Sequence, residues 1–454
     1  MALMRVVSLL VLGLTACREA PVGHQLEGPL FVPAALPECV PSASVRCGTE
    51  AVGLLDRPHS GIASFHRFAD GLPLSKTPRA RVAYERFYWS EFEPRPGEPR
   101  FDLVDASLEQ AHAQGQTWAF RVMPEGDGPQ RVPAWLAESA GGSWGSRNGG
   151  PRAFSPDYDA PAFLEAVERT VAALGARYDG DPRLDHVDVG FVGDAGEWAY
   201  ALSGRAMPST ESTRRILDAF VRAFRKTPVV MLLGSVDDEG LPLKEALQRG
   251  MGWRADCWGD LRRGWNHHDD FYAPQLEKAG ALETWKQSLV TVETCGETEV
   301  WGLLGYSTSQ VRWLLKWALD HHVTLINNKS RAIPAEWRAS FDEFGTYAGA
   351  RFFVFRATTQ TSGVVTVELF NRGTAPLYWP ARLALRQRVG DSVALTVRAY
   401  ATLTRVLPGP FSASFMMPPA PAGATLEVAI VDEAGAVVMP LANEGAVHDG
   451  WLAL

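Results

Sequence analysis

The sequence lacks an excess of basic residues. Its 454 residues include 44 Lys and Arg against 52 Asp and Glu, which gives a formal net charge of -8. Proteins that bind nucleic acid neutralise backbone phosphates with Lys and Arg, and most of their affinity depends on this. The charge balance therefore argues against nucleic acid as a partner.

The sequence also lacks the common metal-binding motifs. It contains five cysteines and ten histidines, but no CxxC and no HExxH spacing. These spacings are frequent signatures of zinc sites. We therefore predict no metal site and no other cofactor.

The apolar run at residues 6–14 is too short to span a bilayer as a mature helix. It follows Arg5 and leads into Leu14-Thr15-Ala16-Cys17, which resembles a bacterial lipoprotein signal over residues 1–17. Cleavage before Cys17 would leave that cysteine as the lipidated N-terminus; an ordinary cleaved signal with Cys17 nearby by chance is the alternative. We expect an exported protein that is lipid-anchored to the bacterial cell envelope, at the outer membrane or cell surface. Residues 18–50, rich in Pro, Ala and Gly, would form a tether.

Four cysteines remain besides Cys17, namely Cys39, Cys47, Cys257 and Cys295. An even number in an exported protein suggests disulfides. Cys39 with Cys47 would close a small loop in the tether. Cys257 and Cys295 would lie near the ends of neighbouring strands and could form a bridge only if their side chains face each other.

The length of the chain predicts two domains. In residues 51–345, short apolar runs alternate with helical stripes, and continuous runs such as 229–233 are typical of strands buried on both faces. The strand candidates are residues 61–65, 82–89, 118–123, 186–192, 229–234, 253–258, 289–294 and 323–327. Eight strands with intervening helices predict an α/β fold, the (β/α)₈ TIM barrel. A doubly wound open sheet is the alternative, but no Gly-rich phosphate turn follows the first strand.

Three other segments qualify this prediction. Residues 67–81 contain Gly71, Pro73 and Pro78, so we expect the first helix to be missing or very short. The long insertion at residues 125–158 carries Trp135 and Trp144, which would either line a substrate cleft or simply pack. Residues 346–454 show short strand-like runs and no helical stripe, which predicts a small C-terminal β-sandwich.

Barrel enzymes carry their catalytic residues at the C-terminal ends of the strands. The fourth predicted strand leads into Gly193-Asp194-Ala195-Gly196-Glu197-Trp198, whose glycines allow a tight turn and close approach to a ligand. Glu197 would reach the barrel mouth beside Trp198, and an adjacent apolar ring would raise its pKa toward that of a general acid. Alternatively, Glu197 caps the following segment or pairs with an arginine such as Arg121.

Glu293 ends the seventh predicted strand. An acidic residue in a β-pattern is costly unless it meets partners in the mouth, and Glu297 is a looser competitor just beyond it. Glu197 and Glu293 would supply the two carboxylates that glycosidic cleavage requires. The candidates for binding sugar hydroxyls or acidic sugar groups are His59, Arg86, Arg121, Trp198, Asp260 and Lys329. The basic side chains could bind a uronate, or could equally be ion-pair partners of the mouth carboxylates.

These features resemble the clan of retaining glycosidases with catalytic glutamates on strands four and seven. Within it, the chain resembles DUF4832-type bacterial proteins, which have a glycoside hydrolase-like barrel followed by a β-sandwich. The stretches that carry this resemblance are residues 56–61 (DRPHSG), 84–89 (YERFYW), 93–97 (EPRPG), 121–124 (RVMP) and 193–198 (GDAGEW). The resemblance covers nearly all of the mature chain. It implies an oligo- or polysaccharide substrate, acid/base duty for Glu197 and nucleophile duty for Glu293.

The sequence departs from the clan at Gly196, where the clan usually has Asn. The order Gly193-x-x-Gly196-Glu197 looks more like the acid-bearing loop of β-amylase-type barrels, which invert. Retention and inversion therefore both stay open. A catalytically inactive carbohydrate-binding lipoprotein, or a structural envelope protein on the same barrel, is the alternative to a hydrolase.

Overall fold

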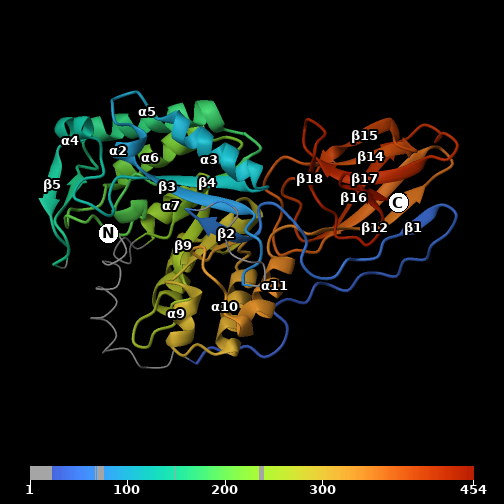
Figure 1. The fold of residues 1–454 in the computed structure, drawn as a ribbon, viewed down its shortest axis with the longest axis horizontal. Helices are drawn as coiled ribbons and strands as arrows, with labels where there is room; N and C mark the ends of the chain where they lie inside the picture. Colours follow the sequence, from blue (N-terminus) through green and yellow to red (C-terminus); the bar gives the residue numbers. More distant parts are fainter. Residues whose placement is uncertain (1–22, 67, 69–75, 148, 235–239) are drawn as a thin grey trace.

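The computed structural model describes residues 23–66, 68, 76–147, 149–234 and 240–454 (Figure 1). The lipoprotein-like signal with Cys17 lies outside these residues. In the described part of the chain, no helix is long and apolar enough to cross a membrane.

Eight parallel strands close into a barrel in the order of the sequence. The strands are β2 (Gly61–Phe65), β3 (Val82–Tyr88), β4 (Thr117–Met123), β7 (Leu184–Asp188), β8 (Val229–Leu232), β9 (Gly252–Trp258), β10 (Val290–Thr294) and β11 (Leu325–Asn327). The last strand, β11, pairs with the first, β2, and this pairing closes the barrel. The predicted (β/α)₈ TIM barrel is therefore confirmed.

Helices surround the barrel strands (Figure 1). They are α2 (Trp89–Phe92), α3 (Phe101–Ala113), α5 (Pro161–Tyr178), α6 (Thr210–Ala223), α7 (Leu241–Gln248), α8 (Ala273–Ala279), α9 (Thr298–Leu303), α10 (Thr308–Asp320) and α11 (Arg338–Tyr347). Helix α5 begins at Pro161, because the first helical position needs no backbone N–H donor. Its apolar stripe, with Val167 and Val171, is fully buried against the barrel. Between β2 and β3, the described residues contain no helix.

The long insertion forms helix α4 (Ala134–Ala140) and a hairpin of β5 (Gly142–Gly145) and β6 (Ala153–Pro156). The Trp135 indole donates to the carbonyl oxygen of Glu93 at 3.1 Å, which fixes it against the outer layer. Trp144 is 45% exposed and packs edge-on against Phe154 of the hairpin. Both side chains therefore pack within or beside the insertion.

Two antiparallel sheets form the predicted β-sandwich (Figure 1). One contains β1 (Val45–Cys47), β12 (Phe352–Thr359), β13 (Val364–Asn371) and β16 (Gly409–Met416). The other contains β14 (Arg382–Val389), β15 (Ser392–Thr402), β17 (Thr425–Val431), β18 (Val437–Met439), β19 (Val447–His448) and β20 (Trp451–Ala453). Val365, Val367 and Leu369 alternate with more exposed residues along β13 and fill the core between the sheets.

The described part of the predicted tether is packed onto the two domains. Strand β1 pairs with β12 of the sandwich, and the Cys39–Cys47 disulfide closes the loop before it. Leu30 is buried, and the backbone N–H of Leu26 donates to Ser309 of α10 at 3.0 Å. From residue 23 onward, the predicted tether at residues 18–50 packs against the two domains at Leu30 and β1, while Val32 and Val40 are largely exposed.

The sandwich contacts the barrel where the strands begin, an end that we call the foot. Trp379 donates to the carbonyl oxygen of Asp185 at 2.9 Å, and Tyr378 donates to that of Trp285 at 2.6 Å. A cavity of about 430 Å³ lies at this junction, lined among others by His59, Trp379 and Met439. The opposite end, which we call the mouth, is where the strands end and where TIM-barrel enzymes carry their active sites.

Candidate active site in the barrel mouth

A strained loop after β7 carries Glu197 to the mouth. Left-handed φ angles occur at Phe191, Gly193, Ala195, Gly196 and Trp198. A Cβ atom at Gly193 would lie 2.8 Å from the carbonyl oxygen of Tyr200, so the expected requirement for glycine in this turn is met. Concentrated backbone strain of this kind is found preferentially at functional sites.

Glu197 lies between two arginines. Its Oε1 accepts a hydrogen bond from Arg121 Nη2 at 3.1 Å and is 3.2 Å from Arg86 Nη1. The side chain of Glu197 remains 22% exposed, whereas that of Arg121 is fully buried. From the sequence, a place in the mouth and a pairing with Arg121 were alternatives for Glu197. The structure shows both.

Glu293, at the end of β10, is buried among four donors. Its Oε2 accepts from Arg86 Nη2 at 2.7 Å, from Asn327 Nδ2 at 3.2 Å and from Arg254 Nη2. Its Oε1 accepts from Lys329 Nζ at 2.8 Å. Burial alone would raise the pKa of Glu293, but the charges of Arg86, Arg254 and Lys329 outweigh it and hold the pKa well below its usual range. Glu293 is therefore a fixed, ionised carboxylate.

One arginine joins the two glutamates. The guanidinium of Arg86 contacts Glu197 through Nη1 and Glu293 through Nη2. A planar fork of donors suits this double contact. The structure thus brings together Glu197, Glu293, Arg86, Arg121 and Lys329, all of which were predicted from the sequence.

Asp256, on β9, is a further carboxyl group of this site that was not predicted from the sequence. It is hydrogen-bonded to Glu197. Burial, the charge and hydrogen bond of Glu197, and the charge of Glu293 together raise the pKa of Asp256 to about 7. Asp256 stands in the apolar pattern of residues 253–258, so it could have been found by the same reasoning as Glu293.

Two predicted binding residues lie elsewhere. His59 precedes β2 and is therefore at the foot, where its Nδ1 is 2.6 Å from Asp185 Oδ2 and its ring stacks on Trp379. Trp198 is 1% exposed, and its indole N–H donates to the carbonyl oxygen of Val189 at 2.8 Å. A buried indole cannot offer its face to a sugar. Neither residue can contact a ligand in the mouth.

Asp260 and Glu297 belong to separate ion pairs. Asp260, just after β9, is 2.6 Å from His267 Nδ1 and 2.8 Å from Arg262 Nε. Glu297, the alternative to Glu293 in the sequence, lies at the start of α9. Its Oε1 is 2.8 Å from Arg331 Nη2. The described contacts therefore favour Glu293 over Glu297 as the second mouth carboxylate.

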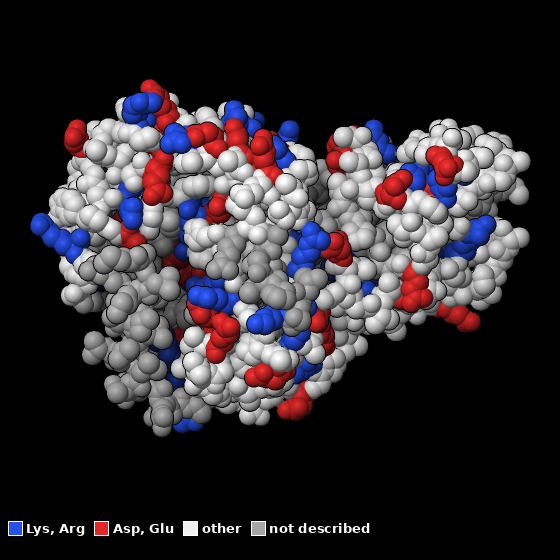
Figure 2. All heavy atoms as spheres, in the orientation of Figure 1, with Lys and Arg blue, Asp and Glu red and all other residues white. Residues whose placement is uncertain are grey.

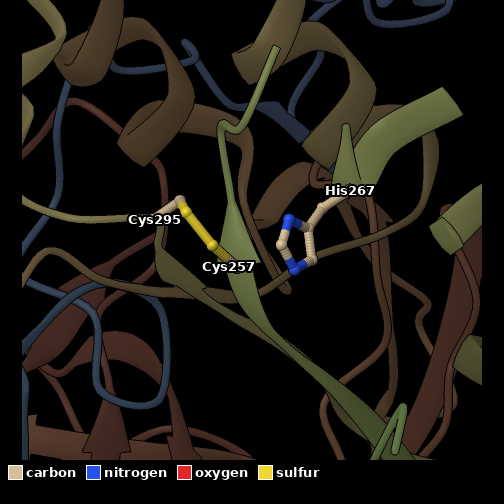
Figure 3. A group of neighbouring side chains, drawn as sticks. All are labelled: Cys257, His267 and Cys295. Atoms are coloured by element: carbon tan, nitrogen blue, oxygen red, sulfur yellow. A yellow bond between two sulfur atoms is a disulfide. The ribbon is translucent and has the colours of Figure 1, made fainter. Parts of the chain in front are cut away.

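The Cys257–Cys295 disulfide links the ends of β9 and β10 beside His267 (Figure 3). Ligand atoms of these three residues lie within 4.8 Å of one another, a spacing that could suit a metal ion. However, the thiolate is the form of cysteine that binds metal, and here the two sulfur atoms are bonded to each other. The bridge instead joins the strands that carry Asp256 and Glu293.

Charges of both signs meet in the mouth. The four cationic side chains are Arg86, Arg121, Arg254 and Lys329, and the four carboxyl groups are Asp188, Glu197, Asp256 and Glu293. On the face of the barrel that Figure 2 shows, basic and acidic side chains are also intermixed. The site thus holds several carboxyl groups, of which Asp256 and Glu293 have pKa values shifted in opposite directions.

Comparison of the sequence with protein-family models and with curated proteins gives no match. The solved structures that are similar to the chain include the following three, which carry glycosidase names. Endo-glycoceramidase II from Rhodococcus sp., as a lactosyl-enzyme intermediate, is 12% identical with a TM-score of 0.42, over 81% of this chain and 100% of that chain. The catalytic domain of β-amylase from Paenibacillus polymyxa is 8% identical with a TM-score of 0.43, over 63% and 98%. Xylanase 10B from Thermotoga petrophila is 13% identical with a TM-score of 0.36, over 59% and 80%. No residue role or substrate is carried over from them, and the DUF4832 resemblance stays a prediction.

Proposed function

We propose that the protein is a glycoside hydrolase that cleaves an O-glycosidic bond in the barrel mouth. The observation that carries this proposal is that neighbouring carboxyl groups in the mouth have pKa values shifted in opposite directions. Asp256 has a raised pKa of about 7 beside Glu197, while Glu293 is held ionised by three cations. Pairs of carboxyl groups whose surroundings separate their pKa values are typical of acid and base assignments in glycosidases.

In this proposal, Glu197 and Asp256 share the proton that the leaving oxygen receives. The two groups are hydrogen-bonded, and a carboxylate pair of this kind takes up one proton more readily than either group alone. Glu197 is the more suitable donor to a substrate, because part of its side chain reaches the surface. The proton that the attacking water releases would then restore the shared proton of Glu197 and Asp256 for the next cycle.

Glu293 supplies the second carboxylate. Its Oε2 is occupied by Arg86, Arg254 and Asn327, whereas Oε1 has Lys329 as its partner in the described residues. Because the side chain of Lys329 is 29% exposed, we place Oε1 as the oxygen that attacks the anomeric carbon or activates water once Lys329 moves. Lys329 would then be available to a sugar hydroxyl or to an acidic sugar group.

The occupied oxygens of Glu293 also favour a second candidate function. A carboxylate surrounded by donors can be an entirely structural ion-pair partner, as in a barrel that binds carbohydrate without cleaving it. The two candidates predict different results in the same assay.

The test is hydrolysis of a panel of oligo- and polysaccharides by the mature protein, with released reducing ends as readout. We expect turnover that Glu197→Gln and Glu293→Gln each lower by about 10³-fold, because each removes a group that acts in the transition state. Glu297→Gln is the matched control, since its carboxylate pairs with Arg331 outside the cluster. Sugar binding without turnover would support the second candidate, and turnover that survives both substitutions would contradict the first.

The anomer released first by the active enzyme determines the stereochemistry. Carboxyl groups about 5 Å apart favour a covalent intermediate and retention, and a wider gap favours attack by water and inversion. Proton NMR of the product within the first minutes distinguishes the two outcomes.

We further propose that the protein is exported and lipid-anchored to the cell envelope through Cys17. The lipobox-like residues 14–17 support this, and the two disulfides suit an oxidising compartment. We expect wild-type protein in the membrane fraction and Cys17→Ser in the soluble fraction. Equal distribution of the two proteins would contradict the anchor.

A further inference from the structure

A buried polar chain begins where the sandwich meets the foot. The Trp379 indole donates to the carbonyl oxygen of Asp185 at 2.9 Å, and its ring stacks on His59 with the ring centres 3.6 Å apart. His59 Nδ1 in turn is 2.6 Å from Asp185 Oδ2. A single side chain of the sandwich thus fixes both the main chain and the side-chain partner of Asp185.

The chain continues inside the barrel along β7. Asp185 Oδ1 is 2.7 Å from His186 Nδ1, and His186 Nε2 lies 3.6 Å from Asp188 Oδ1, an ion-pair distance without a hydrogen bond. Tyr84 of β3 donates its hydroxyl to Asp188 Oδ2. All four side chains are buried, so the interior of this barrel contains a polar column where branched apolar layers are usual.

Asp188 is the branch point toward the mouth. Its Oδ2 is 3.7 Å from Arg254 Nε and 4.0 Å from Arg121 Nη1. Arg121 then contacts Glu197, and Arg254 contacts Glu293. One buried carboxylate therefore lies within ion-pair distance of two arginines, without a hydrogen bond to either, and each arginine contacts one of the mouth glutamates.

Such a column resists independent movement of its parts. Asp188, Arg121 and Arg254 are each at most 2% exposed, so water cannot replace a partner that moves away. Separating one buried charge from its partner is strongly unfavourable. A displacement at Asp185 is therefore expected to be passed along the column.

We propose that the β-sandwich positions the mouth carboxylates through this buried column, with Trp379 and Asp188 as positioning residues. The inference concerns the same carboxyl groups as the proposed function but does not require turnover. The sandwich would then influence the site in the mouth, even though the contacts of Trp379 and Tyr378 with the barrel lie at the foot.

The test measures the pKa of Asp256 by carbon-13 NMR of side-chain carboxyl groups in the mature protein. Asp256 faces Glu197, Glu293 and Arg121, so its pKa reports the arrangement of the cluster. We expect Asp188→Asn to lower this pKa by about one pH unit, since it removes a negative charge and leaves Arg121 and Arg254 more available to the mouth. Trp379→Ala should change this pKa in a folded protein, and Trp379→Phe, which keeps a ring on His59 but loses the indole donor, should change it less.

The same changes at Trp451 are the matched controls. Trp451 is buried in the sandwich against Arg386 and takes no part in the column. A changed Asp256 pKa with both Trp379 variants and none with Trp451→Phe or Trp451→Ala supports the proposal. An unchanged Asp256 pKa in folded Trp379→Phe and Trp379→Ala would overturn the role of the sandwich, whether or not the wild type hydrolyses any glycan. An unchanged pKa in Asp188→Asn would overturn the column itself.

Discussion

Two aspartates of the barrel strands, one near each end, have pKa values shifted in opposite directions. At the foot, burial would raise the pKa of Asp185, but His59 and His186 outweigh it and hold the pKa well below its usual range. At the mouth, burial together with Glu197 and Glu293 raises the pKa of Asp256 to about 7. Asp185 is fully buried and Asp256 only partly so, but burial favours a raised pKa at both positions, and the opposite directions of the two shifts therefore come from the partners.

This difference indicates that Asp185 is a structural carboxylate and that Asp256 is a candidate for catalysis. Both carboxylate oxygens of Asp185 have polar partners. Each contacts a histidine, and Thr117 donates to Oδ2 at 2.9 Å. Asp256 instead faces two other carboxyl groups, an arrangement that costs stability and is kept where protonation serves a reaction. We therefore expect substitutions at the foot to act mainly on folding and, through the column, on the pKa of Asp256, and substitutions at the mouth to act directly on turnover.

The largest expected effect is on catalysis at the mouth. Asp256→Asn should lower kcat/KM for a cleaved glycan by about 10²- to 10³-fold, because the partner that shares the proton with Glu197 is lost. At neutral pH the thermal midpoint should not fall, because the substitution removes the cost of ionising Asp256 beside two other carboxyl groups. Full activity in Asp256→Asn would remove Asp256 from the mechanism.

At the foot, an aspartate-to-asparagine substitution should lower the stability of the fold. Asp185→Asn should lower the free energy of unfolding by about 3 kcal/mol, since it removes one partner of a buried charge cluster. Urea denaturation measures this, and the same measurement on Glu297→Gln, whose carboxylate lies in a partly exposed ion pair with Arg331, serves as the control. If Asp185→Asn were as stable as wild type and Asp256→Asn were not, the comparison would be reversed.

The pH dependence of stability sharpens the same contrast. Because the pKa of Asp256 is raised, its contribution to stability should fall as the pH rises from about 4 to about 7. Because the pKa of Asp185 is lowered, its contribution is present above the unfolded value of about 3.9 and is lost as the pH falls below it. A folded-state pKa that differs from the unfolded value by one pH unit changes the free energy of unfolding by at most about 1.4 kcal/mol.

Urea midpoints between pH 3 and pH 8 provide the measurement. Asp256→Asn should flatten the profile between pH 4 and 7 and leave the acid limb intact, and Asp185→Asn should do the opposite. Identical profiles for the two variants would show that the two sites do not differ in the way we describe.

The smallest effect is expected away from both ends. Trp144→Ala in the insertion hairpin should change the free energy of unfolding by less than about 0.5 kcal/mol and leave turnover unchanged, since the side chain is 45% exposed. A clear rise in KM for a polysaccharide would instead show that the hairpin contacts substrate.

Much of the fold could be predicted because buried parallel strands read as apolar runs. Strand β2 has the predicted bounds, and β9 and β10 differ from theirs by one residue. The fourth strand ends at Asp188 rather than at residue 192, because the residues that follow form the strained loop before Glu197. Strand β1 was missed because its pairing with β12 joins residues that are far apart in the chain.

The site was predictable where chain direction alone placed a residue. Glu293 and Lys329 follow or end strands and so lie in the mouth, while the same rule applied to His59, which precedes β2, would have placed it at the foot. Trp198 has a left-handed backbone and a buried indole, and neither feature can be read from the sequence. The column from Trp379 to Asp188 depends on how two domains meet, which no local pattern encodes.

The most direct test of the account is a carbon-13 titration of the side-chain carboxyl groups of the mature wild-type protein between pH 3 and pH 9. We predict one carboxyl signal that titrates near pH 7 and disappears in Asp256→Asn, together with a Glu293 signal that stays ionised throughout. Ionisation of every mouth carboxyl group below pH 5 would contradict the account.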